Sequence, residues 1–253
     1  SPVLRPEAVA AALWEPEAAD IDVAGLHQSM VRAARRHGAD ILTSTELVAA
    51  EPGESGWTAI VGGSVWHGDA IVDAAGAWGD VVADRCGVDP VGLTPMRRSA
   101  FMVAGEERLA GTPMVIDAHH EWYFKPDGSQ ILCSLSEENP AEPCDARVDE
   151  LDVALAIERI NGATTLDIRS VRSAWCGLRT FAPDRVMVIG PDPNVSRFVW
   201  LVGQGGTGIQ TAPAAGRLAA AAALGEPVPD DLLAAGVDVE ALGPGRLRSV
   251  TGS

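Results

Sequence analysis

The sequence predicts a mixed α/β (α+β) protein in which an antiparallel sheet interrupts an α/β domain. Residues 70–76 form a short apolar run that enters a helix through Ala-Ala-Gly, as strands of parallel sheets do. Residues 96–135 hold several strand-like runs separated by turn residues. The last third returns to apolar strands and a small-residue helix. We therefore expect a discontinuous α/β domain at 1–92 and 176–253, around a sheet domain at 93–175.

The first part of the chain alternates helix and strand signals. Asp20 and Asp22 can cap an amphipathic helix over about 22–37, which Gly38 would end. Strands are expected at 41–48, 57–61 and 65–67, with an acidic, glycine-containing turn at 51–56. A helix over about 77–85 should follow the 70–76 strand.

The remaining elements follow from the same signals. The middle predicts strands at 96–104, 114–117, 121–124, 130–135 and 165–170, and a helix opened by Asp149 or Glu150. Pro126-Asp127-Gly128 supplies turn chemistry. The end predicts strands at 186–189 and 198–202 and a helix over about 209–224, ended by Gly225.

Composition excludes several classes of protein. The chain has 253 residues, of which 47% are hydrophobic and 21% charged, so it can bury a core and is not expected to be disordered. The apolar run at 218–224 is far shorter than the roughly 20 residues that span a bilayer. A net charge of −16 disfavours nucleic acid and anionic membrane surfaces as partners. The four cysteines match no zinc spacing and no secretory signal is visible, which favours reduced thiols in the cytoplasm.

A glycine-rich run follows the 198–202 strand. Gly203-Gln204-Gly205-Gly206-Thr207-Gly208 lets the backbone approach a flat ligand, and the helix after it directs N–H groups toward an anion. A tight strand-to-helix turn without a ligand explains the same run. We do not expect the spacing of Gly203, Gly205, Gly206 and Gly208 to give the dinucleotide fingerprint G-x-G-x-x-G.

Several other polar residues each have a functional and a purely structural explanation. Arg179 could hold a carboxylate in bidentate fashion, although pairing with a surface acid explains it more simply. Arg97 and Arg98 are adjacent in a strand and should point to opposite faces. Tyr123, the only tyrosine, could donate to a carboxylate or be half-buried in the core. Residues 117–121 include an acid–histidine group, but a solvated strand end explains it and no metal site is expected.

Five stretches together resemble the superfamily of FAD-dependent D-amino-acid dehydrogenases and oxidases, with the D-arginine dehydrogenase branch most similar. They are residues 71–78 (IVDAAGAW), 97–101 (RRSAF), 123–127 (YFKPD), 175–179 (WCGLR) and 203–211 (GQGGTGIQT). Their order and spacing match the family from about residue 20 onward.

The resemblance implies a cofactor, FAD, a small-molecule D-amino acid as substrate, and roles for matching residues. Arg179 would grip the substrate carboxylate with help from Arg98 and Tyr123. The substrate pocket would include Met114, Ile116 and the carbonyl of Gly206. Residues implied along the flavin are Ala75, Gly76, Trp78, Gly205, Thr207, Gly208, Ile209, Gln210 and Thr211. Thr207 departs from the branch, where an aromatic residue is usual. The implied reaction transfers hydride from the substrate Cα to flavin N5, and the imino acid hydrolyses to a 2-oxo acid and ammonia.

The family also begins with a βαβ unit that binds the ADP half of FAD, and we expect this unit to be missing from a sequence that opens at Ser1. The chain could be a fragment, could pair with a separate chain that carries the unit, or could be a natural truncation; the first two are favoured. Two functions remain open, a flavin-dependent dehydrogenase completed by the missing segment and a flavin-free binding protein. A subunit of a heteromeric dehydrogenase is a weaker third.

Overall fold

The computed structural model describes residues 1–248, which form two compact units. Unit 1 comprises Ser1–Pro16 and Pro95–Arg179, and unit 2 comprises Glu17–Thr94 and the chain from Thr180 onward. Helices and mixed sheets are both present, so the predicted fold class is confirmed. Each unit is described by itself.

Unit 1 is built on one six-stranded sheet with the order β10-β5-β8-β7-β6, and β9 also pairs with β5. The pairs β5–β8, β5–β9, β6–β7 and β7–β8 run antiparallel, as the turn signals predicted. The strands are β5 (Thr94–Ala104), β6 (Val115–Ile116), β7 (Tyr123–Asp127), β8 (Gln130–Ser134), β9 (Asn139–Pro140) and β10 (Ser173–Phe181), and the helical elements are η1 (Pro6–Ala8), η3 (Glu107–Leu109) and α3 (Glu150–Ala163).

The core of unit 1 lies between the sheet and α3. Phe101, Phe124 and Ile131 of the strands pack with Ile160 of α3, all at most 1% exposed. The amino-terminal segment joins this core because Val3 is fully buried in it and Arg5 N–H donates to the Ala163 carbonyl. The sequence placed residues 1–16 with the α/β domain, and the structure groups them with unit 1.

Unit 2 contains two three-stranded sheets. One has the order β1-β2-β3, and the other has the order β11-β12-β4, in which β12 runs antiparallel to β11 and parallel to β4. The strands are β1 (Leu47–Pro52), β2 (Trp57–Val61), β3 (Ser64–Gly68), β4 (Ile71–Asp73), β11 (Val188–Pro191) and β12 (Phe198–Val202). The helices are α1 (Val23–Arg36), η2 (Gly76–Trp78), α2 (Gly79–Arg85), α4 (Gly208–Leu224), α5 (Asp230–Ala234), α6 (Val239–Leu242) and α7 (Gly245–Arg248).

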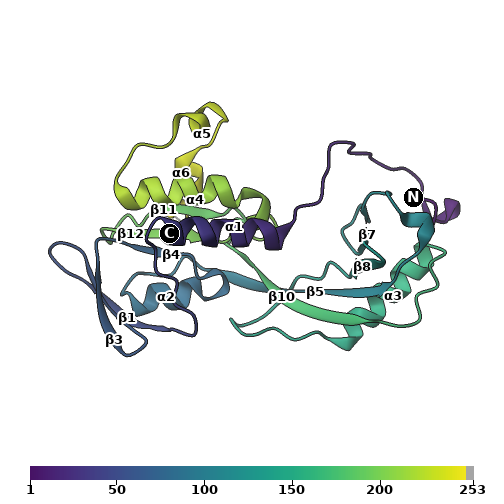
Figure 1. Ribbon diagram of the computed structural model, residues 1–253, viewed down its shortest axis with the longest axis horizontal. Helices are drawn as coiled ribbons and strands as arrows, with labels where there is room; N and C mark the ends of the chain where they lie inside the picture. The colour runs from purple at the N-terminus through teal and green to yellow at the C-terminus, as the bar shows by residue number, and fades with distance from the viewer. Residues whose placement is uncertain (249–253) are drawn as a thin grey trace. The chain divides into compact units, whose positions relative to one another are not determined.

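Strand β12 is buried on both faces, which accounts for its continuous apolar sequence. Phe198, Trp200 and Val202 pack into a core that includes Ala83 of α2, whereas Val199 faces the opposite way into the core with α4. In Figure 1, α4 covers one face of the β11–β12–β4 sheet and α2 lies beyond the other. This two-sided burial holds the carboxyl end of β12 in a fixed place.

Two predicted strands were wrong. Residues 41–46 are not in a strand, and β1 begins only at Leu47, because Ile41 and Leu42 are exposed and have no described strand beside them. Residues 165–170 form a loop whose Ile168 N–H and C=O are held by the side chain of Asn161 instead of by a neighbouring strand. The strand in this region, β10, comes later.

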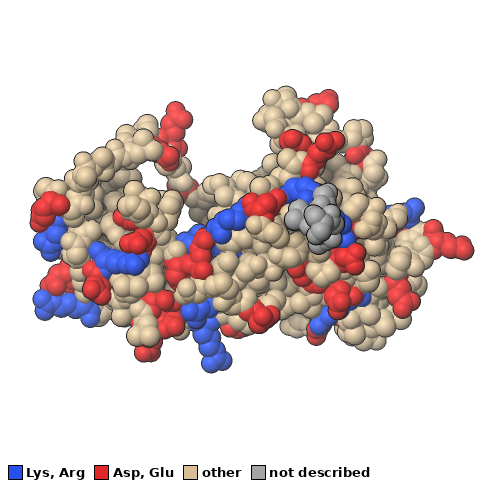
Figure 2. Space-filling model, turned by 180° about the vertical axis from the view of Figure 1, so that it is seen from behind, with Lys and Arg blue, Asp and Glu red and all other residues tan. Residues whose placement is uncertain are grey.

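Charged side chains of both signs lie on the face of the molecule drawn in Figure 2, where they are interspersed. Helix α1 is amphipathic, as predicted, yet it has no buried residue among those described. Within residues 1–248, no helix is both long and apolar enough to cross a membrane.

Candidate functional site

In unit 2, the predicted flavin-contacting segments leave the same edge of one sheet. Strands β4 and β12 are parallel, with Asp73 opposite Trp200. Their carboxyl ends therefore lie at one edge, and residues 74–78 and 203–211 follow directly. A hollow of about 270 Å³ lies here and is lined by Ala74, Leu201, Gln204 and small residues of α4. In α/β sheets, the carboxyl edge of parallel strands is where ligands bind.

The glycine run forms a tight loop into α4. Gly205 has φ +53°, its N–H donates to the Thr180 carbonyl at 2.8 Å, and a Cβ at this position would collide with the Phe181 ring. Thr207 is the N-cap residue of α4, but its hydroxyl donates to the Gln204 carbonyl at 3.0 Å and does not cap the first helical N–H groups. Of the predicted residues in this segment, those exposed are Gly206, Thr207, Ile209 and Gln210, and those half-buried are Gly205, Gly208 and Thr211. The start of α4 thus presents uncapped N–H groups next to exposed backbone.

The glycine spacing of this loop differs from what we expected. Gly203, Gly205 and Gly208 do stand at the positions of G-x-G-x-x-G, and the loop joins a strand to a helix as that fingerprint does. Among the described residues, however, α4 leads to α5, α6 and α7 and to no further strand of the sheet. The loop is therefore not part of a βαβ unit, and the letters alone are insufficient.

The 74–78 segment is shaped by a buried carboxyl group. Asp73 is 1% exposed, and its Oδ1 accepts a hydrogen bond from Ala75 N–H at 3.0 Å. Its Oδ2 is buried without a hydrogen-bond partner in residues 1–248. Burial, and to a smaller extent the charge of Asp80, raises the pKa of Asp73 to about 7, although the Ala75 hydrogen bond lowers it. Gly76 follows with φ +59° and open space at its Cβ position, so the backbone at this turn is accessible.

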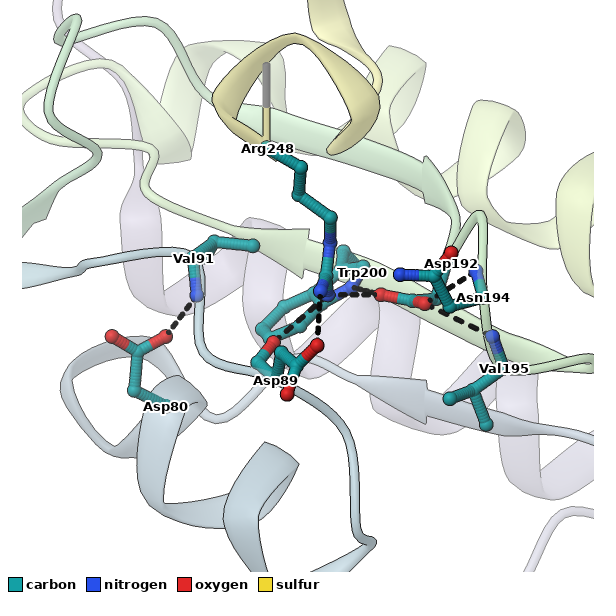
Figure 3. Close-up of polar contacts among 8 residues, drawn as sticks. All are labelled: Asp80, Asp89, Val91, Asp192, Asn194, Val195, Trp200 and Arg248. Atoms are coloured by element: carbon teal, nitrogen blue, oxygen red, sulfur yellow. Dashed lines mark hydrogen bonds and ion pairs between the residues drawn. The ribbon is translucent and has the colours of Figure 1, made fainter. Parts of the chain in front are cut away.

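Another carboxylate cluster stabilises the far end of the same sheet (Figure 3). Asp192 accepts hydrogen bonds from Trp200 Nε1 at 3.0 Å and from the Arg248 guanidinium at 2.6 Å, as well as from two backbone N–H groups. Arg248 also pairs with Asp89. No local sequence pattern marks this network, because Asp89, Asp192 and Arg248 lie far apart in the chain.

A larger apolar hollow of about 790 Å³ lies at the other end of α4, near Gly225 and α6. It contains none of the residues expected to act on a ligand, so its size does not make it the site.

In unit 1, three predicted residues come together. Arg98 of β5 interacts electrostatically with Arg179 of β10 and with Tyr123 of β7. Burial and the charge of Arg179 lower the pKa of the Arg98 guanidinium, while Tyr123, Glu137 and Glu138 raise it. Two guanidinium groups that repel each other favour the binding of an anion, since an anion relieves their mutual repulsion.

The neighbouring Arg97 takes no part in this group. It pairs with Asp152 of α3 at 3.3 Å, whereas Arg98 Nε donates to the Glu137 carbonyl at 2.8 Å. The two arginines therefore have different partners, as their alternation along the strand predicts. Glu137 escaped the sequence analysis because nothing in its local pattern marks it.

The predicted pocket-wall residues lie beside Tyr123. Ile116 is the cross-strand partner of Tyr123 in the β6–β7 pair and is 50% exposed, and Met114, just before β6, is 41% exposed. An exposed apolar residue opposite the tyrosine, with a second one just before the strand, is suited to a substrate side chain.

Residues 117–121 form a turn and not a strand end. The Asp117 carboxylate accepts hydrogen bonds from the N–H groups of His119 and Glu121, at 2.8 and 3.4 Å. No group of three potential metal ligands is found within residues 1–248.

Comparison with known proteins identifies the family to which this fold belongs. The model of the FAD dependent oxidoreductase family, DAO, matches residues 2–222, so the chain belongs to that family. The predicted superfamily is thereby confirmed, and so is FAD as the cofactor of the family. The D-arginine dehydrogenase branch is not singled out by the comparisons.

Several known proteins are similar. Human mitochondrial sarcosine dehydrogenase is 23% identical over 213 residues, which are 78% of this chain and 23% of that protein. Glycine oxidase of Geobacillus kaustophilus is 25% identical over 87% of this chain and 57% of its own length. The chain thus spans well under two thirds of these relatives.

Solved structures agree on the fold. The crystal structure of glycine oxidase from Geobacillus kaustophilus superposes with a TM-score of 0.72 at 22% identity, covering 82% of this chain and 55% of that one. L-Proline dehydrogenase from P. horikoshii gives 0.74 at 18% identity, covering 88% and 59%.

The residues of unit 2 fit the isoalloxazine half of FAD. A flat ring needs close backbone approach, and Gly76 provides backbone with open space at its Cβ position. Uncapped N–H groups at the start of α4 suit a ring edge that bears partial negative charge.

Proposed function

We propose that this chain forms the substrate-binding and flavin-binding parts of an FAD-dependent oxidoreductase that oxidises an amino acid or a related amine. The observation that carries the proposal is the group of Arg98, Arg179 and Tyr123 in unit 1, whose charges favour a carboxylate. FAD supplies the acceptor for the two electrons removed from the substrate. Unit 1 binds the substrate carboxylate and unit 2 binds the flavin.

Each residue has a stated task in this proposal. The guanidinium groups of Arg98 and Arg179 neutralise the carboxylate, and the Tyr123 hydroxyl donates a hydrogen bond to it. Fixing the carboxylate orients the adjacent Cα–H bond. Met114 and Ile116 contact the substrate side chain, and the Gly206 carbonyl accepts from its amine.

In unit 2, Gly205, Thr207 and Gly208 with Ile209, Gln210 and Thr211 contact the flavin through the loop and the start of α4. Ala75, Gly76 and Trp78 contact it from the β4 side. The segment for the ADP half of FAD is proposed to lie outside these 253 residues, upstream or on another chain.

The substrate is proposed to be a D-amino acid, with D-arginine as a first candidate because the quoted stretches resemble that branch, and its imino acid would hydrolyse to a 2-oxo acid and ammonia. The named relatives act on glycine, sarcosine and L-proline. All of these compounds place a carboxylate one carbon from a nitrogen, which the arginine pair can recognise. Four free cysteines suit a reducing compartment, and we propose the cytoplasm.

The test is an anaerobic absorption spectrum of the 253-residue chain incubated with FAD. Addition of D-arginine, D-alanine, glycine or sarcosine should bleach the flavin band. Arg179→Ala should raise the substrate concentration needed for bleaching at least tenfold, because a charged hydrogen-bonded contact is lost. Arg169→Ala is the matched control, since Arg169 is an exposed arginine of unit 1 that pairs with Asp167. A folded protein that binds no FAD would contradict flavin binding by this chain, and a bound flavin that no amine reduces would contradict the activity.

A further inference from the structure

The hydrogen-bond ladder that joins β5 to β8 and β9 is interrupted around Arg98. Met96 and Arg97 pair with β9, and Phe101 to Ala104 pair with β8. Between these two stretches, residues 135–138, which connect β8 to β9, leave the sheet, and Ser136 has φ +62°. Interruptions of this kind occur next to active sites, where they redirect a side chain.

Side chains take the place of the missing ladder bonds. Ser99 N–H donates to the Glu137 carboxylate, and the Ser134 hydroxyl donates to the Ser99 carbonyl at 2.6 Å. Ser99, Ser134 and Glu137 are 3%, 0% and 8% exposed. Buried polar groups that lose such partners are costly, so these bonds determine the path of the 134–138 turn.

The same turn holds Arg98. Its Nε donates to the Glu137 carbonyl at 2.8 Å, and its side chain is only 12% exposed. The carboxylate of Glu137 also offsets the repulsion between Arg98 and Arg179, since its charge raises the pKa that Arg179 lowers. The second carboxylate oxygen, Oε2, is buried and has no hydrogen-bond partner within residues 1–248. Glu137 thus joins the turn, the strand and the guanidinium.

We propose that Glu137 is the positioning residue for Arg98: it anchors the 134–138 turn on Ser99, so that the Glu137 carbonyl fixes Arg98 Nε. Arg98 Nη2 also contacts the Glu138 carboxylate of the same turn at 3.5 Å, and the guanidinium N–H groups that neither residue engages are directed to the ligand carboxylate. This inference rests on the proposed function, because it assigns Arg98 a carboxylate to bind. Bidentate recognition depends on the orientation of the planar guanidinium, which a flexible arginine lacks.

The test follows the Arg98 Nε–H signal in ¹⁵N–¹H spectra of the 253-residue chain, assigned by its loss in Arg98→Lys. Acetate serves as the carboxylate probe. In Glu137→Gln, the amide oxygen still accepts from Ser99, so the Nε–H should remain protected from solvent exchange and the acetate affinity should change less than about threefold. In Glu137→Ala, protection should be lost and the affinity should fall about five- to tenfold, the value of one anchored hydrogen bond. Glu106→Ala is the matched control, because Glu106 pairs with Arg108 at the surface of the same unit.

Three outcomes decide between the two proposals. Protection and affinity in Glu137→Ala equal to those of the unaltered chain would overturn the positioning role. If Glu137→Ala does not fold, Ser134→Ala removes the bond to the Ser99 carbonyl and the bond that Ser134 Oγ accepts from Ser136 N–H in the same turn. It should give the same losses to a smaller degree, while unchanged signals would overturn the role. If the unaltered chain shows no acetate response at Arg98, the carboxylate site of the proposed function fails, and the exchange protection still tests the anchoring by Glu137.

Discussion

Replacing the buried Asp73 by asparagine should change how the stability of unit 2 depends on pH. In the folded chain, burial raises the pKa of Asp73 to about 7 from an ordinary value of 3.8. A carboxyl group whose pKa is raised by folding stabilises the fold below its unfolded pKa, and that stabilisation is lost as the pH rises through the folded value. The relevant window therefore runs from about pH 4 to about pH 7.

The magnitude follows from the shift. A difference of about 3 pKa units, at about 1.36 kcal/mol per unit, amounts to about 4 kcal/mol across the window. The sequence pI is 4.6, so measurements should begin at pH 5.5, above the point of lowest solubility. About 2 kcal/mol of the effect should develop between pH 5.5 and pH 8.

Urea unfolding followed by tryptophan fluorescence measures this, because Trp57 and Trp200 are buried in unit 2. The free energy of unfolding of Asp73→Asn minus that of the unaltered chain should rise by about 2 kcal/mol over this range. Any cost of burying the amide is the same at every pH and cancels in the slope. Asp84→Asn, an exposed acid on α2, is the control and should show no such rise. Parallel pH profiles for Asp73→Asn and the unaltered chain would refute the reasoning.

Three further changes have expected outcomes. Phe124→Ala should lower the free energy of unfolding of unit 1 by about 3–5 kcal/mol in urea denaturation, because a fully buried ring leaves a cavity. Arg248→Ala should cost about 3–5 kcal/mol in unit 2, because it leaves the buried Asp192 carboxylate without its cation, and an equal urea midpoint would contradict this. Gly205→Ala should weaken FAD binding in fluorescence titration at least tenfold, since the new Cβ meets the Phe181 ring and φ is positive; a folded variant with unchanged affinity would show that the loop does not contact flavin.

The fold that this chain shares with its relatives does not specify a substrate. Solved structures of glycine oxidase and L-proline dehydrogenase share the fold of this chain, at 22% and 18% identity. The pair Met114 and Ile116 is exposed and apolar, and it contains no charge that would recognise a cationic side chain. The D-arginine proposal therefore depends on groups other than these two.

Local sequence patterns predicted much of the fold. Apolar periodicity and caps predicted α3, α4, β5, β8 and β12 to within a few residues, because each of these elements buries a face whose pattern repeats along its own length. The cap and periodicity of α1 predicted that helix as well, although it has no buried residue among those described. The 74–78 and 203–211 segments could also be placed, since glycines and small residues directly after buried strands are typical of ligand-facing turns. The strand predicted at 41–48 was mostly wrong, because strand formation requires a neighbouring strand that local pattern does not supply.

The site needed tertiary structure for its decisive features. Arg98, Tyr123 and Arg179 come from three strands, and only the sheet order brings their charges together. Asp73 looks like any acid in the sequence, and its raised pKa arises from burial. Glu137 is one of 35 acids, and its place opposite Ser99 exists only because the β5 ladder is interrupted there. Sequence determined which elements form and which residues can react, and packing decided which of those residues meet, because hydrogen bonds and charges act over a few ångströms and not along the chain.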